Sequence, residues 1–226
     1  MASEYDSYVS AEWKMFVGDG ERARASLEAV AGLEVRRVLD VGCGAGQELL
    51  PFATELGAAC LGVDVTPEAG RAGRELFAAH APKASVTFAR AAAESLPFAE
   101  GTFDVVVCRL ALPYTDNARC LSELARVLRP GGALLLKIHH ARYYTRKLGD
   151  GLRAGQLPSA LHAGRVLAAG LVYSLTGRQP RTRLPSRETF QTLPLLRREL
   201  ARRGLEIRRE LRDSNPLTPS FLIIRA

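Results

Sequence analysis

One segment near the start of the chain reads Val38-Leu39-Asp40-Val41-Gly42-Cys43-Gly44-Ala45-Gly46. Its apolar beginning, which ends at Asp40, predicts a short buried strand, and the glycines after it predict a tight turn into a helix. A strand, a glycine-rich turn and a helix in this order bring backbone amides close to a nucleotide-type ligand. The segment therefore predicts an α/β domain that binds its ligand at the carboxyl end of the first strand.

The spacing of the glycines separates two classes of ligand. It is GxGxG, and Gln47 stands where the dinucleotide fingerprint GxGxxG has its third glycine. A dinucleotide presents a pyrophosphate to the helix N-terminus, whereas S-adenosylmethionine presents an ammonium and a carboxylate. Asp40 is placed to neutralise that ammonium. The loop therefore favours S-adenosylmethionine over NAD.

An acidic residue, Asp64, ends the second predicted strand, 24 residues after Asp40. An acid at this place can accept hydrogen bonds from both hydroxyls of a ribose. NAD enzymes use an acid at the same place, so Asp64 indicates an adenosine-type ligand without choosing between the two. Val65 follows it and is expected near the face of the adenine.

Short apolar runs alternate with segments of helical period, a pattern typical of βαβ units. Strands are predicted at 37–41, 59–63, 85–89, 103–108, 133–138, 205–211 and 219–224. Helices are predicted at 10–17, 45–56, 66–81, 116–128, 157–175 and 187–203. The predicted fold is an α/β three-layer sandwich around a seven-stranded, mostly parallel, Rossmann-like sheet.

The length of 226 residues and the 47% apolar content fit a single domain over residues 1–226. Within it we expect an N-terminal helical cap at 1–34 and a cofactor-binding core at 35–140. A helical lid is expected as an insertion after the fifth strand, at 141–186. A C-terminal helix and the closing strands are expected at 187–226.

Five segments occur in order over residues 35–140. They are the glycine segment 38–46, Leu61-Gly62-Val63-Asp64, Ala93-Glu94-Ser95-Leu96-Pro97-Phe98, Phe103-Asp104-Val105-Val106, and Leu124-Ala125-Arg126-Val127-Leu128-Arg129-Pro130-Gly131-Gly132. Together they resemble the successive motifs of class I S-adenosylmethionine-dependent methyltransferases, in particular the type 11 methyltransferase-domain family. A glycine loop alone would be a weak signal, whereas five ordered matches are a strong one.

The resemblance implies a role for each motif in binding S-adenosylmethionine. It places the methionine part at Asp40, Gly42, Cys43, Gly44 and Gly46, with Cys108 and Arg109 beside it, the ribose at Asp64, and the adenine edge at Ala92, Ala93 and Glu94. The family often has Asp where this chain has Ala92. Either Glu94 or the backbone alone would then hold the adenine amino group.

Methyl transfer needs an aligned acceptor and a dry pocket, and it needs a base only when the acceptor must lose a proton. His139 and His140 follow the fifth predicted strand and Tyr114 follows the fourth, so these three are the catalytic candidates. Neighbouring strand residues point to opposite faces, so at most one histidine faces the ligand, and His140 is the first to test. Each histidine could instead cap the strand or lie on the surface, and Tyr114 could pack in the lid.

The four cysteines lie in apolar contexts without CxxC spacing, so we expect reduced thiols and no metal site. The N-terminus carries no secretory or transit pattern, which favours a cytoplasmic location. The most apolar window, 157–175, is interrupted by His162 and Arg165 and falls short of a membrane span. The sequence does not predict the oligomeric state.

Charge is unevenly distributed along the chain. Residues 137–226 hold 18 Lys/Arg and 6 Asp/Glu, whereas residues 1–136 hold 13 and 18. A basic surface can bind nucleic acid or another anionic partner, and it can also be a solubilising face. The segment Ala111-Leu112-Pro113-Tyr114 lacks the Asn or Asp that methyltransferases of nucleobase amino groups carry in this motif, which disfavours a nucleic acid.

The leading hypothesis is methyl transfer from S-adenosylmethionine to a small molecule, with oxygen as the expected nucleophile. A sugar, a lipid, a quinone-like compound or a specialised metabolite would be the acceptor. One alternative is a protein of the same fold that binds nucleic acid or an anionic partner through its basic C-terminal part. Another is an NAD(P)-dependent oxidoreductase, which Gln47 disfavours.

Overall fold

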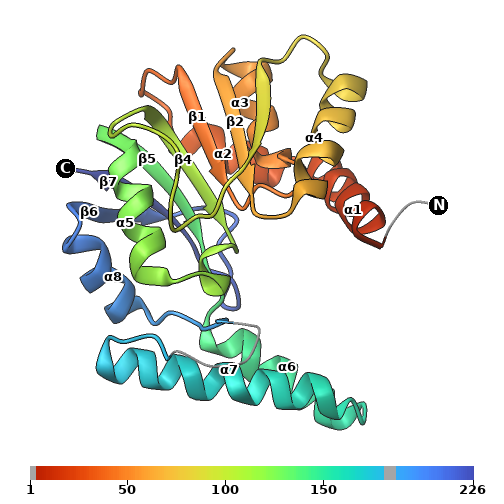
Figure 1. The fold of residues 1–226 in the computed structure, drawn as a ribbon, viewed down its shortest axis with the longest axis vertical. Helices are drawn as coiled ribbons and strands as arrows, with labels where there is room; N and C mark the ends of the chain where they lie inside the picture. Colours follow the sequence, from red (N-terminus) through yellow and green to blue (C-terminus); the bar gives the residue numbers. More distant parts are fainter. Residues whose placement is uncertain (1–3, 181–186) are drawn as a thin grey trace.

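A seven-stranded sheet forms the centre of the computed structural model, which describes residues 4–180 and 187–226. The strands are β1 (Arg37–Val41), β2 (Ala59–Asp64), β3 (Val86–Arg90), β4 (Phe103–Arg109), β5 (Leu128–Lys137), β6 (Leu205–Glu210) and β7 (Ser220–Arg225). Their order across the sheet is β3-β2-β1-β4-β5-β7-β6, and only β7 runs antiparallel to its neighbours (Figure 1). The predicted seven strands and mostly parallel sheet are confirmed.

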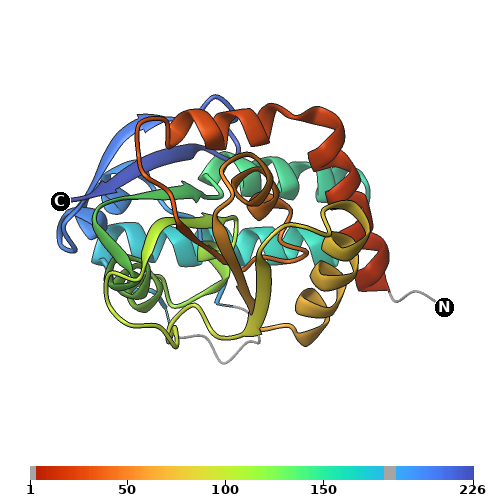
Figure 2. The same ribbon diagram turned by 90° about the horizontal axis from the view of Figure 1, so that it is seen from above.

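Helices cover both faces of the sheet, as Figure 2 shows from above. One face carries α1 (Glu4–Asp19), α2 (Glu21–Ala29), the short 3-10 helix η1 (Gln47–Leu49), α3 (Leu50–Glu55) and α4 (Pro67–His80). The other face carries α5 (Asn117–Val127) and α8 (Leu193–Ala201). Each face has its own apolar core, built by alternate residues of the strands, because side chains along a strand point to opposite sides.

Two glycines lie inside β5, which follows α5 directly and starts five residues before the predicted strand at 133–138. Gly131 has a φ of 72°, which L residues rarely adopt. A Cβ on Gly132 would lie 2.9 Å from the carbonyl oxygen of Asp104, so only glycine lets β4 and β5 approach at this point. The parallel strands β4 and β5 therefore lie side by side, with their carboxyl ends at one edge.

Two antiparallel helices follow β5 and pack against each other beyond the carboxyl ends of the strands (Figure 1). They are α6 (Ala141–Arg153) and α7 (Leu157–Thr176), and we call them the helical hairpin. The ring of Phe190 packs directly against Gly170 of α7, where a Cβ would come within 2.3 Å of the ring. The hairpin occupies residues 141–176 of the segment 141–186, for which the sequence predicts a helical lid; residues 181–186 of that segment lie outside the described residues.

Three of the predicted helices have different bounds in the structure, and α2 and α6 lie where no helix bounds were predicted. The helix predicted at 187–203 spans only Leu193–Ala201, because Pro194 fits only the first turn of a helix. Before it, residues 187–192 run as irregular backbone, held by a hydrogen bond from the Thr189 amide to the Pro113 carbonyl (2.9 Å). The helix predicted at 45–56 divides into η1 and α3, and the one predicted at 10–17 is part of the longer α1.

Candidate functional site

The glycine loop after β1 turns with three residues of positive φ: Gly42, Gly44 and Gly46, at 72°, 53° and 74°. A Cβ on Gly42 would lie 2.3 Å from the Cβ of Ala111, and one on Gly46 would lie 2.7 Å from the ring of Phe88. The absence of a side chain at Gly42 therefore lets the loop after β4 approach. The absence of one at Gly46 leaves room for the ring of Phe88 on β3. Gly44 has no atom within 4 Å of the same position, so it presents open backbone to a ligand.

Two adjoining cavities lie at the carboxyl edge of the sheet, with volumes of about 330 Å³ and about 580 Å³. Both are lined by Gly42, Gly44, Arg109 and Leu110, so together they form one groove across the ends of β1 and β4. The ends of strands in open α/β sheets are where such folds bind ligands.

Asp40 and Glu48 are buried acids that line the smaller cavity. Asp40 stands at the end of β1. The residue is only 2% exposed, and its Oδ2 has no hydrogen-bond partner within the protein. Burial and the neighbouring carboxylate of Glu48 raise its pKa well above the ordinary value. A buried acceptor without a donor costs stability, so Asp40 is suited to receive a cation from a ligand.

Alternating charges surround Asp40 on the wall of the smaller cavity. Glu48 pairs with Arg22 of α2 and with Arg109 of β4, where Nε lies 3.1 Å from Oε1. Arg109 also pairs with Asp213, which binds the ammonium of Lys137 at 2.9 Å. Burial lowers the pKa of Lys137 to about 8. Asp40, Glu48 and Asp213 each have a buried oxygen without a hydrogen-bond partner. Glu48 and Asp213 pair with cations, whereas Asp40 pairs with none among the described residues.

The larger cavity contains Asp64, whose carboxylate is oriented by backbone amides. Its Oδ1 accepts from the amide of Thr66 (2.9 Å) and its Oδ2 from the amide of Gly44 (3.1 Å). Each carboxylate oxygen has a second acceptor site, so both can still accept from a pair of hydroxyls. Val65 is 57% exposed beside it, and Glu94 lines the same cavity while accepting from the amide of Asp116 (2.8 Å).

His139 forms the opposite wall of the larger cavity, just beyond the end of β5. Its ring stacks on Tyr143, with centroids 4.2 Å apart, and makes an edge contact with Tyr114 at 6.1 Å. Its Nδ1 lies 3.0 Å from the hydroxyl of Tyr144. Burial lowers the pKa of His139 to about 4, so the imidazole is neutral at neutral pH.

A chain of hydrogen bonds decides which nitrogen of His139 carries the proton. Tyr144 donates its one hydroxyl proton to Oε1 of Glu188 (2.7 Å), so its oxygen accepts from His139 and Nδ1 is protonated. Oε2 of Glu188 lies 2.7 Å from Nε2 of His162, whose Nδ1 lies 3.2 Å from a guanidinium nitrogen of Arg165. Arginine only donates, so Nδ1 of His162 accepts and Nε2 of His162 donates to Glu188. Tyr144 and His162 therefore both donate to the carboxylate of Glu188. Nε2 of His139 is left as a hydrogen-bond acceptor.

Most of the predicted site residues lie around the groove, and four do not. Those on its walls are Asp40, Gly42, Cys43, Gly44, Asp64, Val65, Ala93, Glu94, Arg109, Tyr114 and His139. Gly46, Ala92 and Cys108 lie outside both linings, and Cys108 is fully buried in the core beneath. His140 accepts from the amide of Arg142 (3.2 Å) and caps α6 instead of facing the groove.

Sequence reasoning missed several residues that shape this groove. Leu110 joins the two cavities with a φ of 64°, the one positive value for a non-glycine residue among those described, and nothing in its sequence context signals it. Arg22 and Glu48 form the charged wall of the smaller cavity. Glu188 is a buried acid, and its only sequence signal is a lone negative charge in a basic region.

Comparison with known proteins is consistent with this geometry. Residues 39–136 match the sequence model of the family described as a methyltransferase domain. Over these residues the chain is similar to the methyltransferase-domain family. An uncharacterised methyltransferase, YcgJ of Bacillus subtilis, is 40% identical over 106 residues, which cover 46% of this chain and 41% of that protein.

Two further methyltransferases are similar over different lengths. Tocopherol O-methyltransferase of Arabidopsis thaliana is 33% identical over 46% of this chain and 30% of its own length. The structure of magnesium protoporphyrin IX methyltransferase from Synechocystis, with bound S-adenosylhomocysteine, matches with a TM-score of 0.60 and 19% identity over 98% of this chain and 83% of that one. The sequence matches thus span less than half of the length of these two curated relatives, and the structural match shows the shared fold.

Proposed function

We propose that this protein transfers the methyl group of S-adenosylmethionine to a hydroxyl oxygen of a small aromatic acceptor. The observation that carries the proposal is the groove itself. It has a buried acid with an unused oxygen at one end, Asp40, and a neutral imidazole with an unprotonated Nε2 on the far wall, His139. S-Adenosylmethionine, when bound, supplies an electrophilic methyl group on a sulfonium.

The smaller cavity suits the methionine end of the donor. The unused oxygen of Asp40 fits an ammonium, and the guanidinium of Arg22 lines the same cavity and fits a carboxylate. The larger cavity suits the adenosine end, where Asp64 accepts from the two ribose hydroxyls and Val65 packs against the adenine. Glu94 would accept from the adenine amino group in place of the acid that the family often has at Ala92.

His139 removes the proton of the acceptor in this proposal. As the acceptor oxygen bonds to the methyl carbon, the carbon–sulfur bond breaks and its electron pair stays on the sulfur. The acceptor proton moves to Nε2 of His139, and Tyr144 holds Nδ1 as a donor throughout. General-base catalysis of this kind contributes typically about 10²–10⁴-fold in rate.

The side chains on the wall of the larger cavity support an aromatic acceptor. The rings of Tyr114 and Tyr143 on the cavity wall suit stacking on an aromatic acceptor. The relative that methylates tocopherol also acts on oxygen, as its name states.

Calorimetry followed by an acceptor screen tests the proposal. We expect saturable binding of S-adenosylmethionine and no binding of NAD, with Asp64→Asn losing affinity and Glu68→Gln, on the exposed first turn of α4, keeping it. Incubation with a phenol library and a host metabolite extract should then yield S-adenosylhomocysteine and an acceptor heavier by one methylene. Binding of NAD alone would indicate an oxidoreductase. Donor binding without product from any acceptor would indicate a binding protein.

We also propose a reducing, cytoplasmic location. The four cysteines are all free and buried, which suits a compartment that keeps thiols reduced.

A further inference from the structure

The outer face of α7 carries six exposed apolar residues. Leu157, Leu161, Ala168, Leu171, Val172 and Leu175 share one side of the helix, with Gly164 between Leu161 and Ala168. Leu161 and Leu175 are 74% and 77% exposed. We call these six residues the apolar stripe. At about 1.5 Å per residue it extends for about 27 Å.

The opposite face of α7 is already in use. Ala160, Ala163, Val166, Gly170 and Tyr173 are buried, and this inner face packs against α6 and Phe190. The helix is therefore apolar on both sides, although only one side is covered. A soluble helix normally shows polar residues on the side away from its core. A continuous exposed apolar surface indicates a binding partner.

The charge of the hairpin indicates the nature of that partner. Residues 141–180 contain six Lys/Arg and a single acidic residue, Asp150. Arg146 and Arg153 both approach Asp150, and their side chains remain 70% and 82% exposed. Leu152, next to Arg153 near the end of α6, is 59% exposed. An apolar face with flanking cations is the signature of a segment that lies on an anionic membrane.

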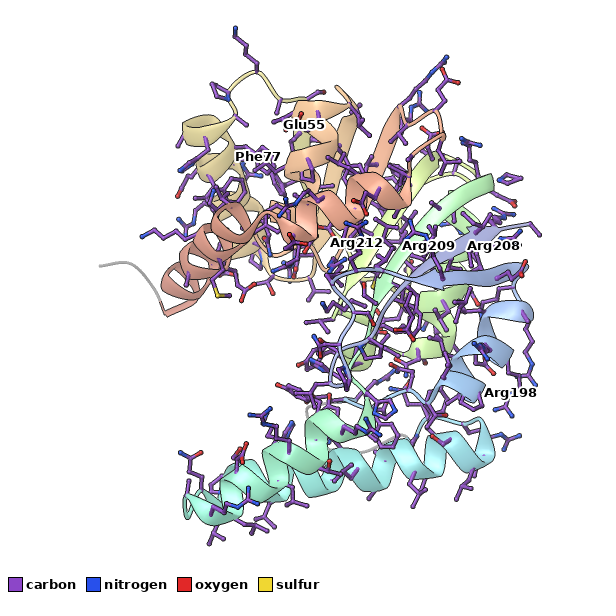
Figure 3. All side chains as sticks on the ribbon, turned by 180° about the vertical axis from the view of Figure 1, so that it is seen from behind. Glu55, Phe77, Arg198, Arg208, Arg209 and Arg212 are labelled. Atoms are coloured by element: carbon purple, nitrogen blue, oxygen red, sulfur yellow. The ribbon has the colours of Figure 1, made fainter. Side chains whose placement is uncertain are left out.

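We propose that the helical hairpin docks on an anionic lipid surface, with α7 in the plane of the interface and the apolar stripe in the acyl boundary. Among the described residues, no helix is long and apolar enough to cross a bilayer, so the hairpin would lie on the membrane. A second copy of this chain is a poorer occupant, since two hairpins with the same excess of positive charge repel each other. Figures 1 and 3 show the hairpin at the end of the molecule, where a flat surface can reach it.

Vesicle flotation tests the docking without any methyl donor or acceptor, so its result does not depend on the proposed function. The full chain is mixed with phosphatidylcholine vesicles, or with vesicles that also contain phosphatidylglycerol. We expect flotation only with phosphatidylglycerol, and weaker flotation at high salt. The double variant Leu161→Glu, Leu175→Glu should lose it, since each leucine contributes roughly tenfold or more in affinity. Leu56→Glu, at another exposed apolar position, should bind as the unaltered protein does.

A charge variant separates the two parts of the surface. Arg146→Gln with Arg153→Gln should weaken binding to anionic vesicles roughly fivefold for each arginine. Circular dichroism and thermal melting of every variant confirm that the fold is kept. The proposal is overturned if the protein ignores both vesicles, or if the leucine double variant still floats. It is also overturned if the stripe mediates a dimer that the same variant dissociates while vesicles are not bound.

Discussion

Asp40 is a residue whose proposed role in ligand binding lowers the stability of the ligand-free protein. Its carboxylate is buried with one oxygen unused, and burial with Glu48 nearby raises its pKa. For an acid whose pKa is raised on folding, stability is lost as the pH rises from about 3.9, the usual unfolded value, toward the folded pKa. The ionised form at neutral pH is therefore unfavourable until a ligand cation arrives.

Asp40→Asn is expected to separate these two effects. The amide keeps the shape and loses the charge, so affinity for S-adenosylmethionine should fall roughly 10- to 100-fold, as a charged hydrogen bond contributes about 1.5–3 kcal/mol. The ligand-free protein should melt at a higher temperature at neutral pH. Calorimetry and thermal melting measure both, with Glu55→Gln at the end of α3 as the control. Unchanged affinity would refute the role of Asp40.

His139 leads to a prediction about pH. Its pKa of about 4 means that the basic form is present at all higher pH values, so kcat/KM should be flat between about pH 5 and 8 and fall only as the pH approaches about 4. Unfolded histidine titrates at about 6.5, so the free energy of unfolding should also decrease as the pH falls from about 6.5 to about 4. His139→Ala should lower kcat about 10²–10⁴-fold. His140→Ala removes only the cap of α6 and should keep kcat; the reverse pattern would restore His140 as the base.

The hydrogen-bond chain connects two helices and two connecting segments of the fold. His139 follows β5, Tyr144 lies on α6, His162 and Arg165 lie on α7, and Glu188 lies in the segment before α8. The packing of the hairpin against the sheet therefore determines which nitrogen of His139, a residue outside the hairpin, carries the proton. The sequence could not predict this, since Tyr144 and Glu188 are 44 positions apart and meet only in the folded protein.

Glu188→Gln is expected to reverse the chain. Arg165 keeps Nδ1 of His162 as an acceptor, so Nε2 of His162 still donates and must face the amide oxygen. The amide NH₂ then faces Tyr144, whose hydroxyl turns to donate to Nδ1 of His139. The proton moves to Nε2, and the base is lost.

Two measurements detect the reversal. Nitrogen NMR of His139 should report protonated Nε2 in place of protonated Nδ1, and kcat should fall roughly 10²-fold with little change in KM. Glu206→Gln, on the exposed surface of β6, is the matched control and should change neither. An unchanged tautomer in Glu188→Gln would exclude the chain as the cause of the positioning.

Elements were predictable where local pattern and tertiary packing agree. The strands follow from short apolar runs, and the helix predicted at 66–81 is observed as α4, with Pro67 at its first position. The segment 187–192 was predicted as helix and is irregular, because buried contacts of Glu188 and Thr189 outweigh local helical periodicity. Packing of this kind leaves no periodic trace in the sequence.

At the scale of the molecule, the basic C-terminal part is less free than its charge suggests. Figure 3 shows Arg208, Arg209 and Arg212 along β6 and the turn after it, and Arg198 on α8. Arg208 pairs with Glu206 (3.2 Å) and Arg212 with Glu28 (3.1 Å), and Arg209 donates to the carbonyl of Glu28. This local pairing favours a small-molecule acceptor over a nucleic acid that would use the surface as a continuous patch.

The ordered motifs predicted the fold and most of the residues on the half of the groove that is proposed to bind the donor, because such a site at the strand ends needs particular residues at fixed places. The acceptor half was not predictable. Of the two histidines, the one placed second, His139, faces the groove, and period-two alternation alone could not choose between them. Leu110 and Tyr144 acquire their roles from backbone geometry and from contacts made after folding.

The two faces of α7 have different roles in the two proposals. The inner face carries His162 and the packing that orients the base, whereas the outer face carries the apolar stripe. Substitutions on the outer face can change where the protein resides in a cell while leaving its chemistry intact. Location in the cell and catalytic activity could therefore be changed independently by substitutions on opposite faces of one helix.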